Sequence, residues 1–239
     1  MWFGNFAWMD YKHLFFDLDH TLWDFDANAR LTLHELYHGH QLETKGVQDF
    51  DLFHKNYILH NNHLWEKYRN GLLKVDDLRW KRMALTLLDF KIGDEMLART
   101  LGDCFLDLLP SRTLLFPFAI EMLEYLTDKG YDLHLITNGF EKTQHCKLKH
   151  SGLDRFFKEV ITSEGSNSIK PKKEIFEYAF KRTNSSPQKS IMIGDSIDAD
   201  IQGAINAGID QVYVNHLKET VTIQPTFTIY SLGELKDIF

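Results

Sequence analysis

The hydrophobic residues of this chain fall into two kinds of pattern, short continuous runs and longer segments with helical spacing. Five short runs predict buried strands, at 13–18, 132–137, 159–162, 190–194 and 211–215. Nearly continuous apolar character is typical of parallel strands that are covered on both faces. Helical patterns separate the last four runs, and strands that alternate with helices indicate a doubly wound α/β sheet. In one of these helical patterns, over 171–183, Pro171 suits the first turn.

A long segment separates the first predicted strand from the second. It exceeds the length of a simple crossover and contains no convincing strand. Its pattern predicts helices at roughly 26–42, 49–70, 75–90 and 94–109. We therefore expect an all-helical cap over residues 24–111, inserted into a Rossmann-like core formed by residues 1–23 and 112–239.

Polar residues with chemical potential follow four of the predicted strands. Asp17 and Asp19 end the first strand, where an ionised carboxylate beside apolar residues needs compensation. Thr137, Asn138 and Gly139 end the second strand, Lys170 follows the third, and Asp195 follows the fourth. Ligands of open α/β sheets bind at the carboxyl ends of the strands. We therefore expect these groups to converge on one rim of the sheet.

Composition and charge narrow the possible partners. The chain has 239 residues, of which 44% are apolar and 26% charged, and its net charge of −7 argues against a nucleic-acid polymer as partner. No apolar run reaches the length of a membrane span. The apolar start "MWFGNFAWMD" lacks the basic residues of a signal peptide, and Met9 is an alternative start. Two distant cysteines, Cys104 and Cys146, fit a reducing compartment and predict no disulfide.

Four ordered motifs carry a family resemblance: "DLDHT", "TNG", "KP" and "GDSIDAD". With them, the chain resembles the haloacid dehalogenase-like superfamily, specifically its Mg²⁺-dependent phosphatases with a helical cap. Within that superfamily, "ITNGFEKTQHCKLKHSGLDRFF" and "KPKKEIFEYA" resemble the pyrimidine-type 5′-nucleotidase branch. The resemblance covers nearly the whole chain, and the cap is the least specific part.

The resemblance implies a role for each motif residue. Asp17 would attack phosphorus, Asp19 would act as general acid and base, and Lys170 would supply positive charge beside both nucleophile and phosphate. Thr137, Asn138 and Gly139, together with Lys170, would bind the phosphoryl group. Mg²⁺ would be held by the Asp17 carboxylate, the Asp19 backbone carbonyl and the Asp195 carboxylate.

These roles predict a cytoplasmic phosphomonoesterase, a monomer or homodimer, that hydrolyses small soluble phosphates through an aspartyl-phosphate. Nucleoside 5′-monophosphates of the pyrimidine type are the expected substrates, because the branch resemblance and the aromatic cap residues favour a planar base. The alternatives are a sugar-phosphate or phosphoglycolate phosphatase, or a phosphomutase. A dehalogenase is disfavoured, because that reaction does not need Asp19 as a leaving-group acid. A non-catalytic binding module is disfavoured because every motif residue is chemically competent.

Residues beside the motifs have weaker assignments. Asp200 would orient either the metal ligands or Lys170, or would cap the next helix, whereas Asp198 is expected to cap that helix. The related phosphatases often have a glycine a few residues before the lysine, and here Asn167 is expected to take the same turn with a positive φ.

Two further pairs of residues are candidates for ligand binding, one for the substrate and one for a metal ion. Trp23 and Phe25 either line the substrate entrance or simply pack at the hinge into the cap. His34 and His38 lie four residues apart on a predicted helix, but they lack a third ligand of clear geometry, so we interpret them as an ordinary cap surface.

Overall fold

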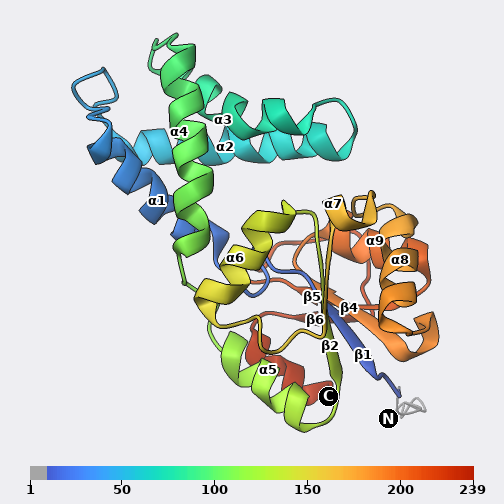
Figure 1. Ribbon diagram of the computed structural model, residues 1–239. Helices are drawn as coiled ribbons and strands as arrows, with labels where there is room; N and C mark the ends of the chain where they lie inside the picture. Colours follow the sequence, from blue (N-terminus) through green and yellow to red (C-terminus); the bar gives the residue numbers. More distant parts are fainter. Residues whose placement is uncertain (1–9) are drawn as a thin grey trace. The chain divides into compact units, whose positions relative to one another are not determined.

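The computed structural model describes residues 10–239 (Figure 1), so the proposed alternative start at Met9 lies outside the described residues. The chain divides into two compact units. The core unit comprises the residues up to Trp23, Leu115–Gln144 and Gly152–Phe239. The cap unit comprises Asp24–Leu114 together with His145–Ser151.

A fully parallel sheet forms the centre of the core unit, as the apolar runs predicted. Its six strands have the order β3-β2-β1-β4-β5-β6, and every neighbouring pair is parallel. The strands are β1 (His13–Phe16), β2 (Asp132–Thr137), β3 (Glu159–Thr162), β4 (Ser190–Gly194), β5 (Asp210–Val214) and β6 (Phe227–Ile229). The first strand thus stops two residues earlier than predicted, so Asp17 and Leu18 already lie beyond the regular ladder.

The sixth strand was not predicted. β6 is three residues long, lies at the edge of the sheet and exposes its central residue, Thr228. A strand this short offers too few positions for an apolar run to stand out from the surrounding loop. The strand forms because it pairs with β5, and that pairing is a tertiary contact that the local sequence does not show.

Helices cover both faces of the sheet, which confirms the doubly wound architecture (Figure 1). On one face, Phe15 and Met192 pack with apolar residues of α8 and α9. Leu14 and Phe16 alternate to the opposite face, as successive strand residues must.

The helical elements of the core unit are α5 (Ala119–Asp128), α6 (Glu141–Ser151, which continues into the cap unit), α7 (Ser163–Ser166), α8 (Lys173–Thr183), η2 (Pro187–Lys189), the π-helix η3 (Ile197–Ile201), α9 (Gln202–Ala207) and η4 (Leu232–Asp237).

The cap unit contains only helices among the described residues, as the insertion predicted. Its main elements are α1 (Phe25–Gly39), α2 (Phe50–Arg69), α3 (Val75–Asp89), α4 (Glu95–Leu108) and the short η1 (Leu109–Ser111). Side-chain caps begin three of them, since Asp24, Asp49 and Asp94 each accept a hydrogen bond from a backbone N–H in the first turn. The bounds agree with the predicted helices to within a few residues.

Two general predictions can be compared with the described part of the chain. Cys104 and Cys146 are both free thiols, in agreement with the cysteine spacing. Within residues 10–239, no helix combines the length and the apolar character that crossing a bilayer requires.

Candidate active site

The turn after β1 separates the two acidic residues of the first motif. Asp17 continues the strand direction, and its backbone N–H donates to the Ile193 carbonyl on β4 at 2.9 Å. The chain then reverses through His20, whose φ is +64°, and the N–H groups of Leu22 and Trp23 return to the Leu18 carbonyl. Asp17 and Asp19 are therefore not held to one face of a strand, and the turn directs each carboxyl group separately.

Lys170 is completely enclosed at the same edge of the sheet. Its side chain is 1% exposed, and its Nζ donates to Asp17 Oδ1, to Asp200 Oδ1 and to the Ile136 carbonyl, each at 2.6 Å. An ammonium group has three hydrogens, so these bonds use all of them. Burial by itself lowers the pKa of Lys170, but the two carboxylates outweigh burial and raise the pKa above its usual value. The lysine therefore stays charged.

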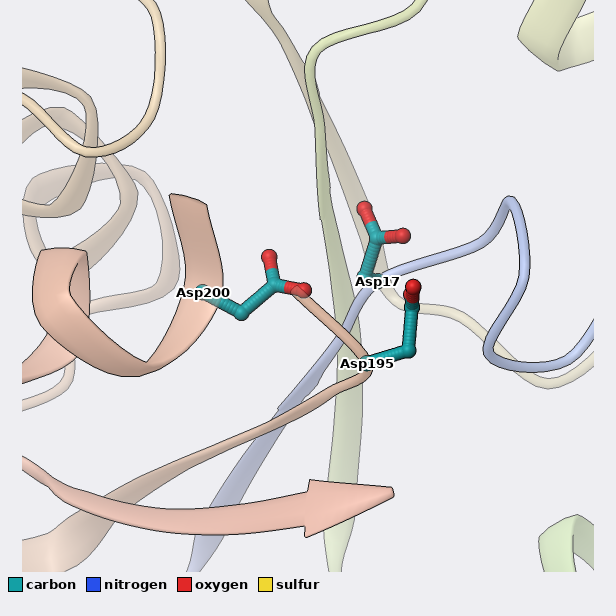
Figure 2. Close-up of side chains that lie close together, drawn as sticks. All are labelled: Asp17, Asp195 and Asp200. Carbon is teal, nitrogen blue, oxygen red and sulfur yellow. The ribbon is translucent and has the colours of Figure 1, made fainter. Parts of the chain in front are cut away.

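Three carboxyl groups lie close together at this edge of the sheet, those of Asp17, Asp195 and Asp200 (Figure 2). Oxygen atoms of Asp17, Asp195 and Asp200 all lie within 4.8 Å of one another. Burial raises the pKa of Asp17 well above its usual value, and burial together with Asp200 raises the pKa of Asp195 to about 7. The Thr21 hydroxyl partly offsets this by donating to Asp195 Oδ1 at 2.8 Å. One lysine cannot neutralise three acids, so the cluster is short of positive charge.

The surplus of buried carboxyl oxygens fits a hard divalent cation. Mg²⁺ prefers oxygen ligands, and carboxylates with raised pKa values are those that gain most from a nearby positive charge. The raised pKa values of Asp17 and Asp195 show that these groups lack such compensation from the protein alone. The residues present therefore fit the cation that the sequence motifs imply.

Asp200 occupies the position expected for a residue that orients Lys170. One of its oxygens contacts the lysine, and the other accepts the Ser196 backbone N–H at 3.0 Å. Gly194 makes room for this carboxyl group, because a Cβ at Gly194 would lie only 2.3 Å from Asp200 Oδ2. A glycine in the fourth motif is thus a steric requirement of the site.

The capping role predicted for Asp198 is wrong. Ser196 is the N-cap residue of η3, and its hydroxyl oxygen accepts the Ala199 N–H at 3.1 Å, whereas Asp198 is exposed. Serine and aspartate are both favoured as N-cap residues. Because the helix begins at Ile197, the residue at the N-cap position is Ser196. The prediction that Pro171 lies in a first helical turn is also wrong, because α8 begins at Lys173.

The second motif supports both the lysine and the rim. The Asn138 amide brackets the backbone of Lys170: its Oδ1 accepts the Lys170 N–H at 2.8 Å and its Nδ2 donates to the Lys170 carbonyl at 3.0 Å. The Asn138 side chain therefore fixes the backbone of Lys170. Thr137 Oγ1 accepts the Gly139 N–H at 3.1 Å.

Other sequence expectations have mixed outcomes. Asn167 does adopt the left-handed conformation, with φ of +52°, as the C-cap residue directly after the short helix α7. Trp23 is completely buried, which favours packing over substrate contact for that residue. His34 and His38 bring their Nε2 atoms to 3.2 Å on the exposed side of α1, and within residues 10–239 no third His, Cys, Asp or Glu completes a ligand group with them.

Two polar residues of the site were not recognised in the sequence. Thr21 lies within the first motif, and its hydroxyl both donates to the Asp195 carboxylate and accepts the Asp195 N–H at 3.1 Å. Gln144 is fully buried, and its Nε2 donates to Asp19 Oδ2 at 2.8 Å. Gln144 follows the second motif on a predominantly polar helix, where one more polar residue gives no signal.

A buried carboxylate held against an ammonium group at the end of a central parallel strand is the arrangement of an enzyme that uses a carboxylate in group transfer. The chain matches the family described as haloacid dehalogenase-like hydrolase over residues 11–208, and it belongs to that family. The family resemblance of the four motifs is therefore confirmed.

Two relatives match nearly the whole chain. The chain is 34% identical to the pyrimidine 5′-nucleotidase PynA of Streptococcus pneumoniae over 232 residues, covering 96% of this chain and 95% of that protein. It is 29% identical to the pyrimidine 5′-nucleotidase YjjG of Escherichia coli, covering 96% of this chain and 98% of that protein.

A solved structure agrees with the fold. The magnesium-bound structure of the HAD-hydrolase YfnB of Bacillus subtilis aligns with a TM-score of 0.85 at 31% identity, covering 95% of this chain and 98% of that one. That structure is reported to reveal interdomain movement.

Proposed function

We propose that this protein is a Mg²⁺-dependent phosphomonoesterase that hydrolyses nucleoside 5′-monophosphates, most efficiently those with a pyrimidine base. The observation that carries the reaction class is the Asp17 carboxylate, 8% exposed at the end of β1 and 2.6 Å from a fully buried lysine. The substrate class rests on the full-length similarity to PynA and YjjG.

The first half of the reaction transfers the phosphoryl group to Asp17. An Asp17 carboxylate oxygen attacks phosphorus, and the bond between phosphorus and the ester oxygen breaks. The departing electron pair stays on the ester oxygen, which takes a proton from the Asp19 carboxyl group and leaves as an alcohol. Asp17 is then an acyl phosphate and Asp19 is a carboxylate.

The second half regenerates the carboxylate. Water attacks phosphorus and gives its proton to Asp19, and the bond between phosphorus and the Asp17 oxygen breaks. The products are inorganic phosphate and the original pair of acids. Lys170 and the Thr137 hydroxyl offset the negative charge of the phosphoryl oxygens during both displacements.

Mg²⁺ would be held by the carboxylates of Asp17 and Asp195 and by the Asp19 backbone carbonyl. A cation there supplies electrostatic compensation for an anionic nucleophile that approaches an anionic substrate. The close cluster of Asp17, Asp195 and Asp200, with only one lysine among them, supports this part of the proposal.

The cap aromatics give less support to the choice of base than the sequence suggested. Arg99 lies over the Trp80 ring at 4.0 Å, and Trp65 and Tyr68 pack edge to face at 5.6 Å. These rings already have partners within the cap unit. Pyrimidine preference therefore rests on the relatives rather than on a visible stacking surface.

The test is a substrate panel measured with purified protein. kcat/KM for phosphate release should be highest for UMP or dUMP, lower for hexose phosphates and phosphoglycolate, and abolished by EDTA until Mg²⁺ is restored. A sugar phosphate or phosphoglycolate that exceeds every pyrimidine nucleotide by tenfold would replace the nucleotidase assignment with the alternative phosphatase. Isomerised sugar phosphate without free phosphate would instead indicate a mutase.

The cytoplasm is the compartment that suits this proposal, because nucleotides are abundant there and both cysteines are free thiols. A monomer or homodimer is the expected assembly, and light scattering of the eluted protein distinguishes the two. A larger assembly would contradict this part.

A further inference from the structure

Gln144 joins two residues of the active-site rim through a single amide group. Its side chain lies on α6 within the core unit and is 0% exposed. Nε2 donates to Asp19 Oδ2 at 2.8 Å and to Thr137 Oγ1 at 2.7 Å. We propose that Gln144 is a positioning residue that aligns the general acid Asp19 with the phosphoryl-binding hydroxyl of Thr137. This inference rests on the function proposed above.

The chemistry of the neighbours determines how the amide is oriented. Nε2 has two hydrogens, and the two bonds use both. The reversed orientation would place Oε1 against a carboxylate oxygen, where two acceptors repel. In the observed orientation Oε1 is buried without a hydrogen-bond partner, which is a cost. Two bonds offset that cost, because the amide donates both to an Asp19 carboxyl oxygen and to the Thr137 hydroxyl.

The bond to Thr137 also orients its hydroxyl hydrogen. Thr137 Oγ1 accepts from Gln144 Nε2 and from the Gly139 N–H at 3.1 Å. A hydroxyl oxygen has two acceptor lone pairs and one hydrogen. With both lone pairs occupied, the remaining capacity of Thr137 is to donate. A phosphoryl oxygen, which only accepts, is the group that such a hydroxyl recognises.

The bond to Asp19 restrains the carboxyl group that must reach the leaving oxygen. With Oδ2 held by Gln144, rotation of the Asp19 side chain is limited to positions that keep this contact. Proton transfer requires close hydrogen-bond distance to the ester oxygen, and misplacement of about 1 Å can cost on the order of 10²-fold in rate. In this proposal Gln144 affects the reaction through Asp19 and does not itself contact the substrate.

Gly139 gives an independent sign that the amide position matters. A Cβ at Gly139 would lie 1.9 Å from Gln144 Nε2, and its φ is not in the left-handed region. Backbone conformation therefore does not require glycine here, whereas the space taken by the amide does. Gly139 is therefore needed to leave room for the Gln144 amide.

The test compares two substrates that differ in their need for a proton. The leaving group of UMP is the 5′ oxygen of uridine, which is strongly basic and needs a proton from Asp19, whereas p-nitrophenyl phosphate releases a stable phenolate and needs that proton less. In Gln144→Met, kcat for UMP should fall about tenfold to a hundredfold, and kcat for p-nitrophenyl phosphate should fall less than about fivefold. Gly139→Ala should show the same substrate dependence. Gln188→Met, at an exposed glutamine of η2, should match the wild type.

A double variant separates positioning from general damage. Asp19→Ala should itself lose far more activity on UMP than on p-nitrophenyl phosphate. Adding Gln144→Met to Asp19→Ala should then lower kcat for UMP only by the small factor seen with p-nitrophenyl phosphate, because the Asp19 contact is already gone and only the Thr137 contact remains to be lost. Gln144→Asn, which withdraws the amide by one methylene and keeps its polarity, should reproduce the loss if Gln144→Met does not fold.

Each result leads to a distinct conclusion. Equal losses on both substrates, additive with Asp19→Ala, would overturn the positioning role while leaving the phosphatase intact. Equal losses in Asp19→Ala itself would remove the general acid and the inference with it. A wild-type protein without Mg²⁺-dependent phosphate release would reject the proposed function before Gln144 is considered.

Discussion

The two ends of the central strands bury ionisable groups in different ways. At the carboxyl ends of β1 and β4, carboxyl oxygens of Asp17 and Asp195 lie within 4.8 Å of one another and of Asp200, and Lys170 bonds to Asp17 and Asp200. Toward the amino ends of β1 and β2, His13 Nδ1 and His134 Nε2 lie 3.1 Å apart, stacked with a centroid separation of 5.4 Å. The acidic cluster and the histidine pair both involve β1, so the same strand carries buried ionisable groups at its two ends.

The difference lies in how each end handles charge. Burial lowers the pKa of His13, and burial together with His13 lowers the pKa of His134 to about 4, so both imidazoles are neutral near pH 7. Asp132 beside them is ionised but pairs with Lys158 at 2.5 Å and Lys12 at 3.4 Å. The amino end is therefore balanced, whereas the carboxyl end keeps an uncompensated negative charge. Buried negative charge that the protein does not neutralise is typical of a functional site, so the carboxyl end of the strands is the candidate ligand-binding end.

The largest effect is expected from a change at Asp17, the proposed nucleophile. Asp17→Asn should lower kcat for phosphate release by at least about 10³-fold, because an amide cannot form the acyl phosphate. The thermal midpoint should not fall, since the shapes are nearly equal and one buried negative charge is removed. The matched change at the other end, Asp132→Asn, should leave kcat within about twofold. Near-wild-type turnover of folded Asp17→Asn would contradict the mechanism.

Removal of the lysine should test the charge imbalance directly. Lys170→Met leaves Asp17, Asp195 and Asp200 facing one another without a buried cation, and should lower the free energy of unfolding by about 3–5 kcal/mol at pH 7.5. Urea denaturation measures this value. Lys173→Met, which removes an exposed ion pair with Glu177, should change it by less than about 0.5 kcal/mol. Equal effects of the two variants would show that the acids do not depend on Lys170.

The histidine end predicts a dependence of stability on pH. The pKa of His134 is about 4 in the folded protein and 6.5 in the unfolded chain, so below pH 6.5 the unfolded state binds a proton that the folded state excludes. Stability from this group is therefore complete above pH 6.5 and is lost as the pH falls toward 4. Between pH 7.5 and 5 the loss should be about 2 kcal/mol.

His134→Phe should abolish that part of the pH dependence. The phenylalanine can pack against Phe15, whose ring centroid lies 5.1 Å from that of His134. Urea denaturation of both proteins at pH 7.5 and pH 5 measures the difference. Parallel pH profiles for wild type and variant would show that His134 does not stay neutral in the folded state.

The smallest effect is expected from a single, partly exposed hydrogen bond to a carboxylate at the amino end of the strands. The Tyr11 hydroxyl donates to Asp210 Oδ2 at 2.7 Å, ahead of β1. Tyr11→Phe should lower the free energy of unfolding by about 1.5 kcal/mol and leave kcat unchanged. Tyr230→Phe, at an exposed tyrosine, serves as the control. A loss of activity in Tyr11→Phe would show that the two ends of the sheet are coupled.

The relation between sequence and structure differs among these residues for a physical reason. Asp17, Thr137 and Asp195 each follow an apolar strand, and parallel strands must bring their carboxyl ends together. Local pattern therefore predicted that these residues share one rim, and the structure shows Lys170 in contact with Asp17 there. The helical insertion was equally visible, because helical spacing is a property of neighbouring residues.

Tertiary structure decided what depends on residues distant in the chain. Gln144 is one polar residue on a polar helix until the fold brings it to Asp19, 125 positions earlier. Ser196 rather than Asp198 caps η3 because the helix begins at Ile197, and β6 exists because β5 offers it a partner. The sequence by itself determined which side chains can perform the chemistry. Folding alone decided which other groups hold them in place, because those contacts have no periodicity along the chain.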